Sequence, residues 1–478
     1  MIRSLLLTLV LASPALAAGP KVTFVIGDKA TPTDKLAAEQ LSKDFHALFD
    51  AETTVQAAFP KEATNVVLIG HPQSNAAIPA DGWPKLTSQG HILKSTKQGL
   101  IVGGGSPVAT LWAASELSHR FGIRHLLSGD VMPVEKPAFK LDGFDVTLEP
   151  KILVRGWSMF NGSASGGESW TKDEHLALLR QLVKLKFTHL LLPTRVTPPQ
   201  PVSVDGDTPG RKAFGGAKKF PAVDPKVHIT PDAKALGFQV AQAGLVTHAL
   251  GASGPSVLPQ FFLANLERRF QTMTKYHHNS FMAGAMMPGD LDAAAYFASR
   301  ASFDDKITAA RSVADLITPI CGEGVSDSVW KAFDLIGQAT KLIEKNDPNI
   351  GIPSADMLTR HLDSKDALPA WITEVKTLYT NAMSEMYRAN TRARDGARAF
   401  TLHHAKRLEF AMQYFTALEA LYKAHDKAAR DESLEAALES IYNGLNALGD
   451  SARDASDRGA IALMNENGCR VLAKLQTK

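Results

Sequence analysis

Apolar residues recur along this chain at two spacings, and the change from one spacing to the other marks its regions. Short β-branched runs at residues 21–27 and 65–70 predict strands, and residues 32–49 between them show helical spacing. The apolar face of that helix consists of Ala37, Leu41, Phe45 and Leu48. A hairpin at 91–95 and 99–102 and a helix at 107–121 follow, so the first region is predicted to be a small α/β unit.

Three consecutive glycines, Gly103, Gly104 and Gly105, lie between the second hairpin strand and the helix at 107–121. Glycines in this position can direct backbone N–H groups at a phosphate. The triplet lacks the Lys-Ser/Thr of a P-loop and the spacing of a dinucleotide fingerprint. The sequence therefore does not favour nucleotide binding, and no cofactor is predicted.

From about residue 150 to residue 300 short strand patterns alternate with helical ones, which is typical of βα units. We predict a strand at 153–160, a helix at 172–186 and a strand at 188–192. A loop at 194–230 is rich in Pro, Gly and Lys, and loops of this length are usually functional or disordered. Helical spacing returns at 258–277.

Beyond residue 302 nearly all of the chain has helical spacing, with two strong apolar faces. One face comprises Leu408, Met412, Phe415, Leu418 and Tyr422, and the other comprises Leu434, Leu438, Ile441, Leu445 and Leu448. Such faces bury against neighbouring helices more often than they bind a partner. We predict a helical bundle.

The first 17 residues have the order of a cleavable signal peptide: a lone Arg3, an apolar run at 5–12, and small residues ending at Ala17. No later stretch reaches the roughly 18 apolar residues that a spanning helix needs. The formal charge of +3 includes no sustained basic block, which argues against nucleic acid as a partner. We expect a periplasmic or secreted protein without a membrane span; its oligomeric state is left open.

The chain has two cysteines, Cys321 and Cys469. An oxidising compartment permits a disulfide between them, but isolated thiols also pack as small buried groups, so both alternatives stay open. The adjacent histidines at 277–278 and 403–404 point about 100° apart on a helix and cannot chelate a metal as pairs. No metal site is predicted.

Several segments of the first 200 residues together resemble the front part of known barrel glycosidases. They are the strand, glycine turn and helix at 100–117, Gly122-Ile-Arg-His-Leu126, Val154-Arg155-Gly156-Trp157, and the run 184–193. The chain resembles the α-glucuronidases of glycoside hydrolase family 67 and the β-hexosaminidases of family 20. The resemblance implies a small α/β domain in front of a βα barrel, with a helical C-terminal extension.

The sequence patterns and this resemblance together predict an α/β plus all-α fold class. It consists of a small N-terminal α/β sandwich-like domain, a reduced or divergent TIM-type barrel, and a C-terminal helical bundle. The predicted division is 1–17 signal peptide, 18–148 α/β domain, 149–300 barrel-like domain and 301–478 helical domain. A closed eightfold barrel typically needs about 250 residues, more than the middle region offers. Either the barrel is incomplete, or later strands lie in segments with helical spacing.

Glycoside hydrolysis needs two carboxyl groups, which in a barrel lie at the carboxyl ends of strands. Asp290 and Asp292 follow the apolar run 281–287, although Asp290 could instead cap a helix at 291–299. Glu168 follows the first strand, and Asp207 lies in the long loop, where Asp-Gly-Asp could also be a solvated turn. These four residues are the catalytic candidates.

Acids that open helices are excluded from this set. The pair Asp173-Glu174 belongs to a capping box with Thr171, and Ser302 with Asp305 predicts a second one. The adjacent Asp-Glu pair of family 20 is therefore not visible.

The substrate-binding candidates are Arg155, Trp157 and Asn161, which lie on or just after the first strand. We expect Arg155 to bind hydroxyls or a uronate carboxylate from an open cleft, with an interdomain salt bridge as its alternative. Trp157 could stack on a sugar or pack in the core. The predicted function is hydrolysis of a poly- or oligosaccharide by an exported protein; the alternative is a noncatalytic relative that binds carbohydrate or a partner.

Overall fold

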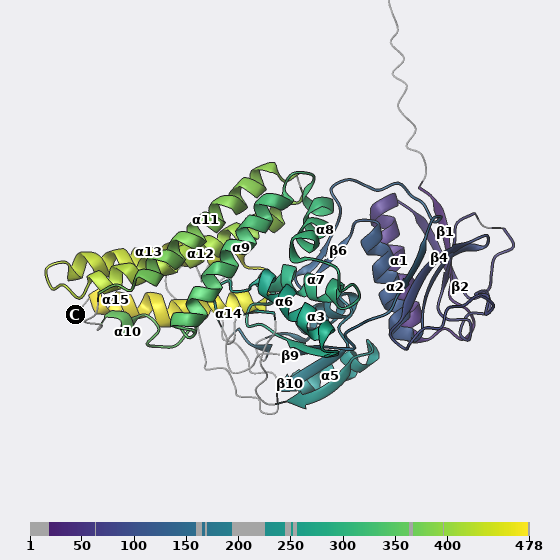
Figure 1. Ribbon diagram of the computed structural model, residues 1–478, viewed down its shortest axis with the longest axis horizontal. Coiled ribbons are helices and arrows are strands. Elements are labelled where there is room, and N and C mark those ends of the chain that lie inside the picture. The colour runs from purple at the N-terminus through teal and green to yellow at the C-terminus, as the bar shows by residue number, and fades with distance from the viewer. Residues whose placement is uncertain are drawn as a thin grey trace, which may run out of the picture.

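Two sheets and a bundle of helices follow one another along the chain, as seen from right to left in Figure 1. The structure is a computed structural model. It describes residues 19–62, 64–158, 165–167, 170–193, 225–243, 250–251, 256–362, 367–394 and 396–476.

The first sheet has six strands in the order β2-β1-β3-β5-β4-β8. The strands are β1 (Lys21–Val25), β2 (Glu52–Gln56), β3 (Val66–Ile69), β4 (His91–Thr96), β5 (Gly99–Gly104) and β8 (Asp145–Leu148). The first four positions in this order are parallel, whereas β4 is antiparallel to both β5 and β8. The strands and the hairpin expected from the sequence are confirmed.

Two helices, α1 (Pro32–Phe49) and α2 (Pro107–Arg120), pack together against this sheet. Helix α1 begins with a capping box between Thr31 and Asp34, and α2 begins at Pro107 after the N-cap Ser106. The predicted apolar face of α1 is buried. Both helices form where expected because their start signals are local and their apolar faces have a sheet to cover.

The glycine triplet serves close packing of strand and helix. A Cβ atom on Gly104 would lie 2.4 Å from the backbone carbon of Ala109 and 2.5 Å from the backbone nitrogen of Thr110. A Cβ atom on Gly105 would lie 1.9 Å from the backbone oxygen of Thr87. Only glycine lets α2 approach β5 this closely.

Replacing Gly104 with alanine should therefore lower the free energy of unfolding by about 2–3 kcal/mol, because backbone atoms cannot yield to the added methyl group. Gly468→Ala is the matched control, since its Cβ atom would meet side-chain atoms at 3.4 Å or more. Urea denaturation of both variants measures the difference. Equal stability of the two variants would contradict this explanation of the triplet.

The second sheet has four parallel strands in the order β11-β10-β9-β12. They are β9 (Val154–Ser158), β10 (His189–Pro193), β11 (Gln239–Ala243) and β12 (Ser280–Ala283). The connecting and following helices are α3 (Lys172–Lys184), α5 (Pro225–Ala235), α6 (Leu263–Lys275) and α7 (Asp292–Ala301). The predicted βα units are confirmed. In the described residues the strands form an open sheet, so the barrel is not confirmed.

One of the two capping predictions in this region is wrong. Thr171 and Glu174 do form a capping box at the start of α3. Ser302 instead ends α7, where its hydroxyl donates to the carbonyl of Ala298, and the next helix, α8 (Ala309–Cys321), starts after the N-cap Thr308. The chain makes a turn at 303–308 before that helix, which the Ser-x-x-Asp spacing does not reveal.

The C-terminal region is a bundle, as predicted. Its helices are α8, α9 (Ser326–Asn346), α10 (Thr359–Leu362), α11 (Ala370–Arg392), α12 (Arg398–Lys423), α13 (Arg430–Ser451), α14 (Ala455–Met464) and α15 (Arg470–Gln476). Helix α12 packs against α11 and α13, and its apolar face is largely buried there. The two apolar faces found in the sequence thus form the bundle core.

The second sheet lies between the other two parts of the molecule (Figure 1). At its amino edge, Trp112 of α2 packs against Arg155 near the start of β9. At its carboxyl edge, Ser456 of α14 donates to the carbonyl of Ser165, which follows β9. The indole N–H of Trp170 donates to the Ser456 hydroxyl (3.2 Å). Helix α14 of the bundle therefore contacts the segment that follows β9, near the edge at which parallel sheets usually bind ligands.

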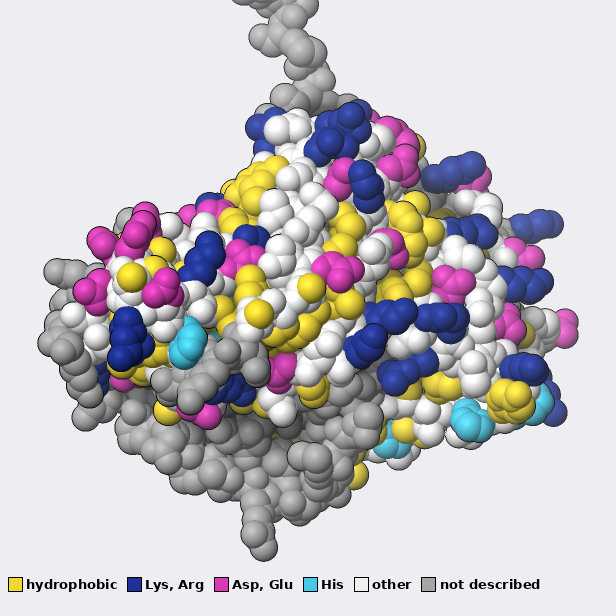
Figure 2. Space-filling view, turned by 60° about the vertical axis from the view of Figure 1, so that its left-hand side comes forward, with side chains coloured by type: hydrophobic (Ala, Val, Ile, Leu, Met, Phe, Trp, Pro, Cys, Tyr) yellow, Lys and Arg dark blue, Asp and Glu magenta, His cyan; other side chains and the backbone are white. Residues whose placement is uncertain are grey.

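None of the described helices is long and apolar enough to cross a membrane. Cys321 and Cys469 are both buried free thiols. Figure 2 shows that acidic and basic side chains are interspersed over one face of the molecule.

Candidate functional site

A small cavity lies at the carboxyl edge of the second sheet, just beyond β12. The chain leaves β12 through residues 284–287 and enters a short 3-10 helix, η2 (Pro288–Leu291). The cavity has a volume of about 30 Å³, room for one or two water molecules. Its polar lining is provided by Ser256, Gln260 and Asp290.

Asp290 is held by an arginine from the bundle. Nε and Nη2 of Arg407 in α12 donate to the two carboxylate oxygens at 2.8 and 2.6 Å. Nη2 also donates to the carbonyl of Val257 (2.9 Å). Both side chains are buried, and this two-pronged pair fixes the carboxylate against the sheet edge.

The helix-cap alternative for Asp290 is wrong. Helix α7 has Leu291 at its N-cap, and no side chain accepts a hydrogen bond there. The carboxylate turns instead toward Arg407, a residue 117 positions away in the sequence.

Polar atoms without a hydrogen-bond partner gather around this edge. Within the described part of the chain, they are Oε1 of Gln260, Nη1 of Arg407 and Nε2 of His403. Each side chain is buried. Unsatisfied buried polar atoms are costly and uncommon, so they mark positions where a water or a ligand hydroxyl can bind.

Asp292 lies two residues further on, and its carboxylate faces a different part of the molecule. Its oxygens accept from the backbone N–H (3.1 Å) and the hydroxyl (2.5 Å) of Ser128, in the turn between β6 (Arg124–Leu126) and β7 (Gly129–Val131). The side chain has no exposed surface. Burial raises the pKa of Asp292 to about 6, although the Ser128 hydrogen bonds oppose this shift.

This raised pKa predicts a stability difference that depends on pH. The folded chain holds the Asp292 proton more tightly than the unfolded chain, whose carboxyl titrates near 3.8, so the group costs stability as pH rises from about 4 to 6. Asp292→Asn removes this cost. Relative to the wild type, the variant should gain on the order of 2 kcal/mol between pH 4 and pH 7. Denaturation at several pH values tests this, with the exposed Asp81→Asn as control; parallel curves for Asp292→Asn and the wild type would contradict it.

The expectation that Arg155 faces an open cleft is wrong. Arg155 is the second residue of β9 and therefore lies at the amino edge, and its side chain has no exposed surface. Nε donates to the carbonyl of Lys186 (2.6 Å) and Nη1 to that of Ile152 (2.5 Å). The guanidinium lies 5.1 Å from the ring centres of both Trp112 and Phe303.

The alternative prediction for Arg155 was an interdomain salt bridge. Arg155 does lie where α2 packs against the second sheet, but it donates to backbone carbonyls rather than to a carboxylate. Trp157, two residues along the same strand, is also buried and packs edge-on against Phe187. Side chains two apart on a strand share a face, so both lie on the covered side of the sheet. Trp157 is a core residue.

Three other candidates, Asn161, Glu168 and Asp207, lie outside the described residues.

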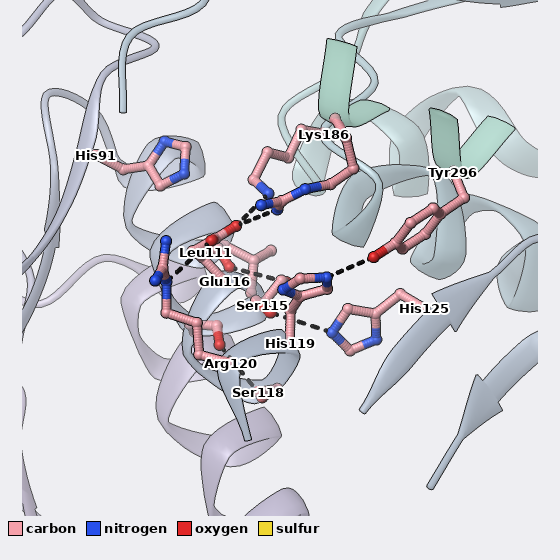
Figure 3. Close-up of polar contacts among 12 residues, drawn as sticks. His91, Leu111, Ser115, Glu116, Ser118, His119, Arg120, His125, Lys186 and Tyr296 are labelled. Carbon is pink, nitrogen blue, oxygen red and sulfur yellow. Dashed lines mark hydrogen bonds and ion pairs between the residues drawn. The ribbon is translucent and has the colours of Figure 1, made fainter. Parts of the chain in front are cut away.

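A second polar cluster, centred on Glu116 of α2, reaches the amino edge of the second sheet through Lys186, which lies just before β10. Figure 3 shows this cluster. One Glu116 oxygen contacts Nζ of Lys186 (3.0 Å) and Nη1 of Arg300 (2.7 Å), and the other accepts from Nε of Arg120 (3.2 Å). Burial alone would raise the pKa of Glu116, but Arg300 and Lys186 outweigh it and hold that pKa well below its usual range. Lys186 follows α3 with a φ of 63°, in the left-handed region.

Sequence reasoning missed Gln260, Arg407 and Glu116. A signal exists for Glu116, which is the one acid in the apolar helix at 107–121. Arg407 falls among the buried positions of its helix, where a permanently charged residue needs a partner. Gln260 stands alone in the apolar run 257–263. Among the described residues, no group of three or more His, Cys, Asp or Glu side chains is arranged to hold a metal ion.

Compared with models of known families and with curated proteins, the sequence matches none. Among solved structures, it is similar to a family GH115 4-O-methyl-α-glucuronidase with specificity for decorated arabinogalactans. That similarity has a TM-score of 0.61 at 12% identity, and covers 94% of this chain and 80% of the other. The fold is glycoside-hydrolase-like.

Two further structures align over most of the chain with lower scores. A family GH138 enzyme targeting pectin rhamnogalacturonan II has a TM-score of 0.39 at 9% identity, covering 90% of this chain and 74% of the other. CpGH84B has a TM-score of 0.42 at 8% identity, covering 94% and 96%. The GH115 likeness does not support the specific resemblance to families 67 and 20.

Proposed function

We propose that this chain is an exported glycoside hydrolase that acts on a poly- or oligosaccharide at the carboxyl edge of its second sheet. The observation that carries the proposal is the position of Asp290: a fixed carboxylate that lines a small cavity, beside Ser256 and Gln260, where the strands of a parallel sheet end. The glycoside-hydrolase-like fold supports the same chemistry. The sugar and the linkage are left open.

The environment of Asp290 suits one of the two carboxyl roles. Both of its oxygens accept charge-assisted hydrogen bonds from the guanidinium of Arg407, the usual pairing of arginine with a carboxylate. An ionised carboxylate can activate water or attack the anomeric carbon, whereas the leaving group needs a protonated acid. We assign Asp290 the first role and propose Glu168 or Asp207 as the acid, with Asn161 binding hydroxyls.

The remaining candidates are assigned structural roles rather than catalytic or substrate-binding ones. Asp292 is bonded to Ser128 and fully buried, and Arg155 and Trp157 lie in the covered face of the sheet. None of these three residues is among the described residues that line the cavity at the carboxyl edge. We propose that they stabilise the fold.

A noncatalytic carbohydrate-binding protein is the second candidate. It is favoured by one observation: in the described residues, Asp290 is the one carboxylate in the cavity lining, and Arg407 already occupies it. Hydrolysis requires a second carboxyl group within roughly 5 to 9.5 Å.

Incubating the purified protein with a panel of polysaccharides and oligosaccharides, and measuring both released sugar and binding, separates the two candidates. We expect a product, and we expect Gln260→Leu to reduce turnover about tenfold or more, since a buried amide that binds a substrate hydroxyl is worth 1–3 kcal/mol. Gln271→Leu, an exposed amide on α6, is the control. Binding of a glycan without release of sugar would favour the noncatalytic candidate. Unchanged turnover in Gln260→Leu would show that the cavity is not part of the active site.

A further inference from the structure

A second, larger pocket lies at the boundary between α2, β6, α7 and α8, on the side of the second sheet opposite the candidate site. Its volume is about 320 Å³, which is within the usual range of small-molecule sites. Charged side chains dominate its lining: Arg120, Arg124, Arg300, Arg311, Asp304 and Asp315.

One of the four arginines is fully engaged by the protein. Arg124 donates from Nε to the carbonyl of Asp315 (2.8 Å), from Nη1 to that of His119 (2.8 Å), and from Nη2 to the Asp315 carboxylate (3.2 Å). The other oxygen of Asp315 accepts from the hydroxyl of Tyr296 (2.5 Å). Arg124 and Asp315 therefore form a fixed wall.

The other arginines keep donors for a ligand. Arg120 and Arg300 share the single charge of Glu116 with Lys186, and each arginine contacts the carboxylate through one nitrogen. Their side chains are 38% and 21% exposed, so their remaining N–H groups reach the pocket. Arg311, at the start of α8, makes no side-chain hydrogen bond or ion pair within the described part of the chain.

The charges around the pocket do not balance. Arg120, Arg124, Lys186, Arg300 and Arg311 supply five positive charges, and Glu116, Asp304 and Asp315 supply three negative ones, which leaves an excess of two. His119 adds none, because burial lowers its pKa to about 3. Two unbalanced positive charges at the wall of a cavity favour a doubly charged anion.

We propose that this pocket binds a dianionic oxyanion, a phosphate or sulfate group, either free or as a monoester on a larger molecule. Arginine N–H groups suit this ligand, because planar guanidinium groups make paired, charge-assisted bonds to such oxygens. The site is separate from the carboxyl-edge cavity, so it stands whether or not the chain hydrolyses glycans.

Isothermal titration calorimetry at constant ionic strength tests the proposal with inorganic phosphate, sulfate and glucose 6-phosphate as probes. We expect saturable binding of one anion per chain. Arg311→Ala should weaken it about tenfold or more, the loss of one charge-assisted contact, and Arg311→Lys should retain part of the affinity. Arg311 is exposed and its side chain has no ion pair with another described residue, so its removal should leave the melting temperature unchanged.

Arg392→Ala is the matched control, an exposed arginine on α11 whose loss changes the net charge equally. Tighter binding of glucose 6-phosphate than of phosphate would identify an ester as the ligand, and the reverse would identify the free anion; both support the site. No saturable binding of any probe, equal weakening in Arg392→Ala, or tighter binding of the monoanion glucuronate than of phosphate would overturn it.

Discussion

Replacing Glu116 with alanine should lower the free energy of unfolding by about 3–5 kcal/mol, the usual cost of breaking a buried ion pair from one side. Glu116 has no exposed surface, and the Lys186 side chain is only 5% exposed. Without the carboxylate, the ammonium group of Lys186 would remain buried close to Arg300 and Arg155, without a counter-charge. The cost therefore comes mainly from the cation left behind.

A double-mutant cycle in chemical denaturation measures this directly. In a Lys186→Met background the Glu116→Ala change should cost clearly less than in the wild type, because the stranded cation is absent. Glu39→Ala, an exposed acid on α1, should change stability by no more than about 0.5 kcal/mol. Equal costs of Glu116→Ala in both backgrounds would contradict the assigned role of Lys186.

Replacing Arg407 with methionine should have an effect of similar size, about 3–5 kcal/mol, because it strands the Asp290 carboxylate, which is buried against the sheet edge. The double variant Arg407→Met/Asp290→Leu should recover most of that stability, since replacing a whole buried pair by apolar side chains is often neutral.

The same variants separate stability from chemistry. If Asp290 takes part in hydrolysis, the double variant should be stable but inactive on whatever glycan the wild type cleaves. The exposed Arg180→Met is the control and should match the wild type in both measurements. A double variant no more stable than Arg407→Met alone would show that the ion pair does not explain the loss, and an active one would remove Asp290 from the mechanism.

Local signals in the sequence predicted local structure well. Thr171 and Glu174 make their capping box within a single turn, and the apolar face of α1 needs only a neighbouring sheet to be buried. The bundle was predictable for the same reason, since apolar faces of that length bury against one another.

The candidate site was harder to predict because its interactions are long-range. Asp290 follows a strand pattern in the sequence, but its partner Arg407 lies 117 residues away and reaches it through the packing of the bundle against the sheet. The strand predicted at 153–160 already puts Arg155 near its amino end, and Arg155 is the second residue of β9, so a cleft at the carboxyl edge was the wrong expectation for its side chain. Closure of the barrel depends on pairings between strands that sequence periodicity does not specify.

Hydrogen–deuterium exchange, with and without the oligosaccharide that the protein cleaves or binds best, tests most directly whether the carboxyl edge is the functional site. We expect slower exchange in residues 256–262 and 283–291, which surround the cavity beside Asp290. Protection confined to other parts of the chain, such as the first sheet or helix α6, with none in these two segments, would contradict it.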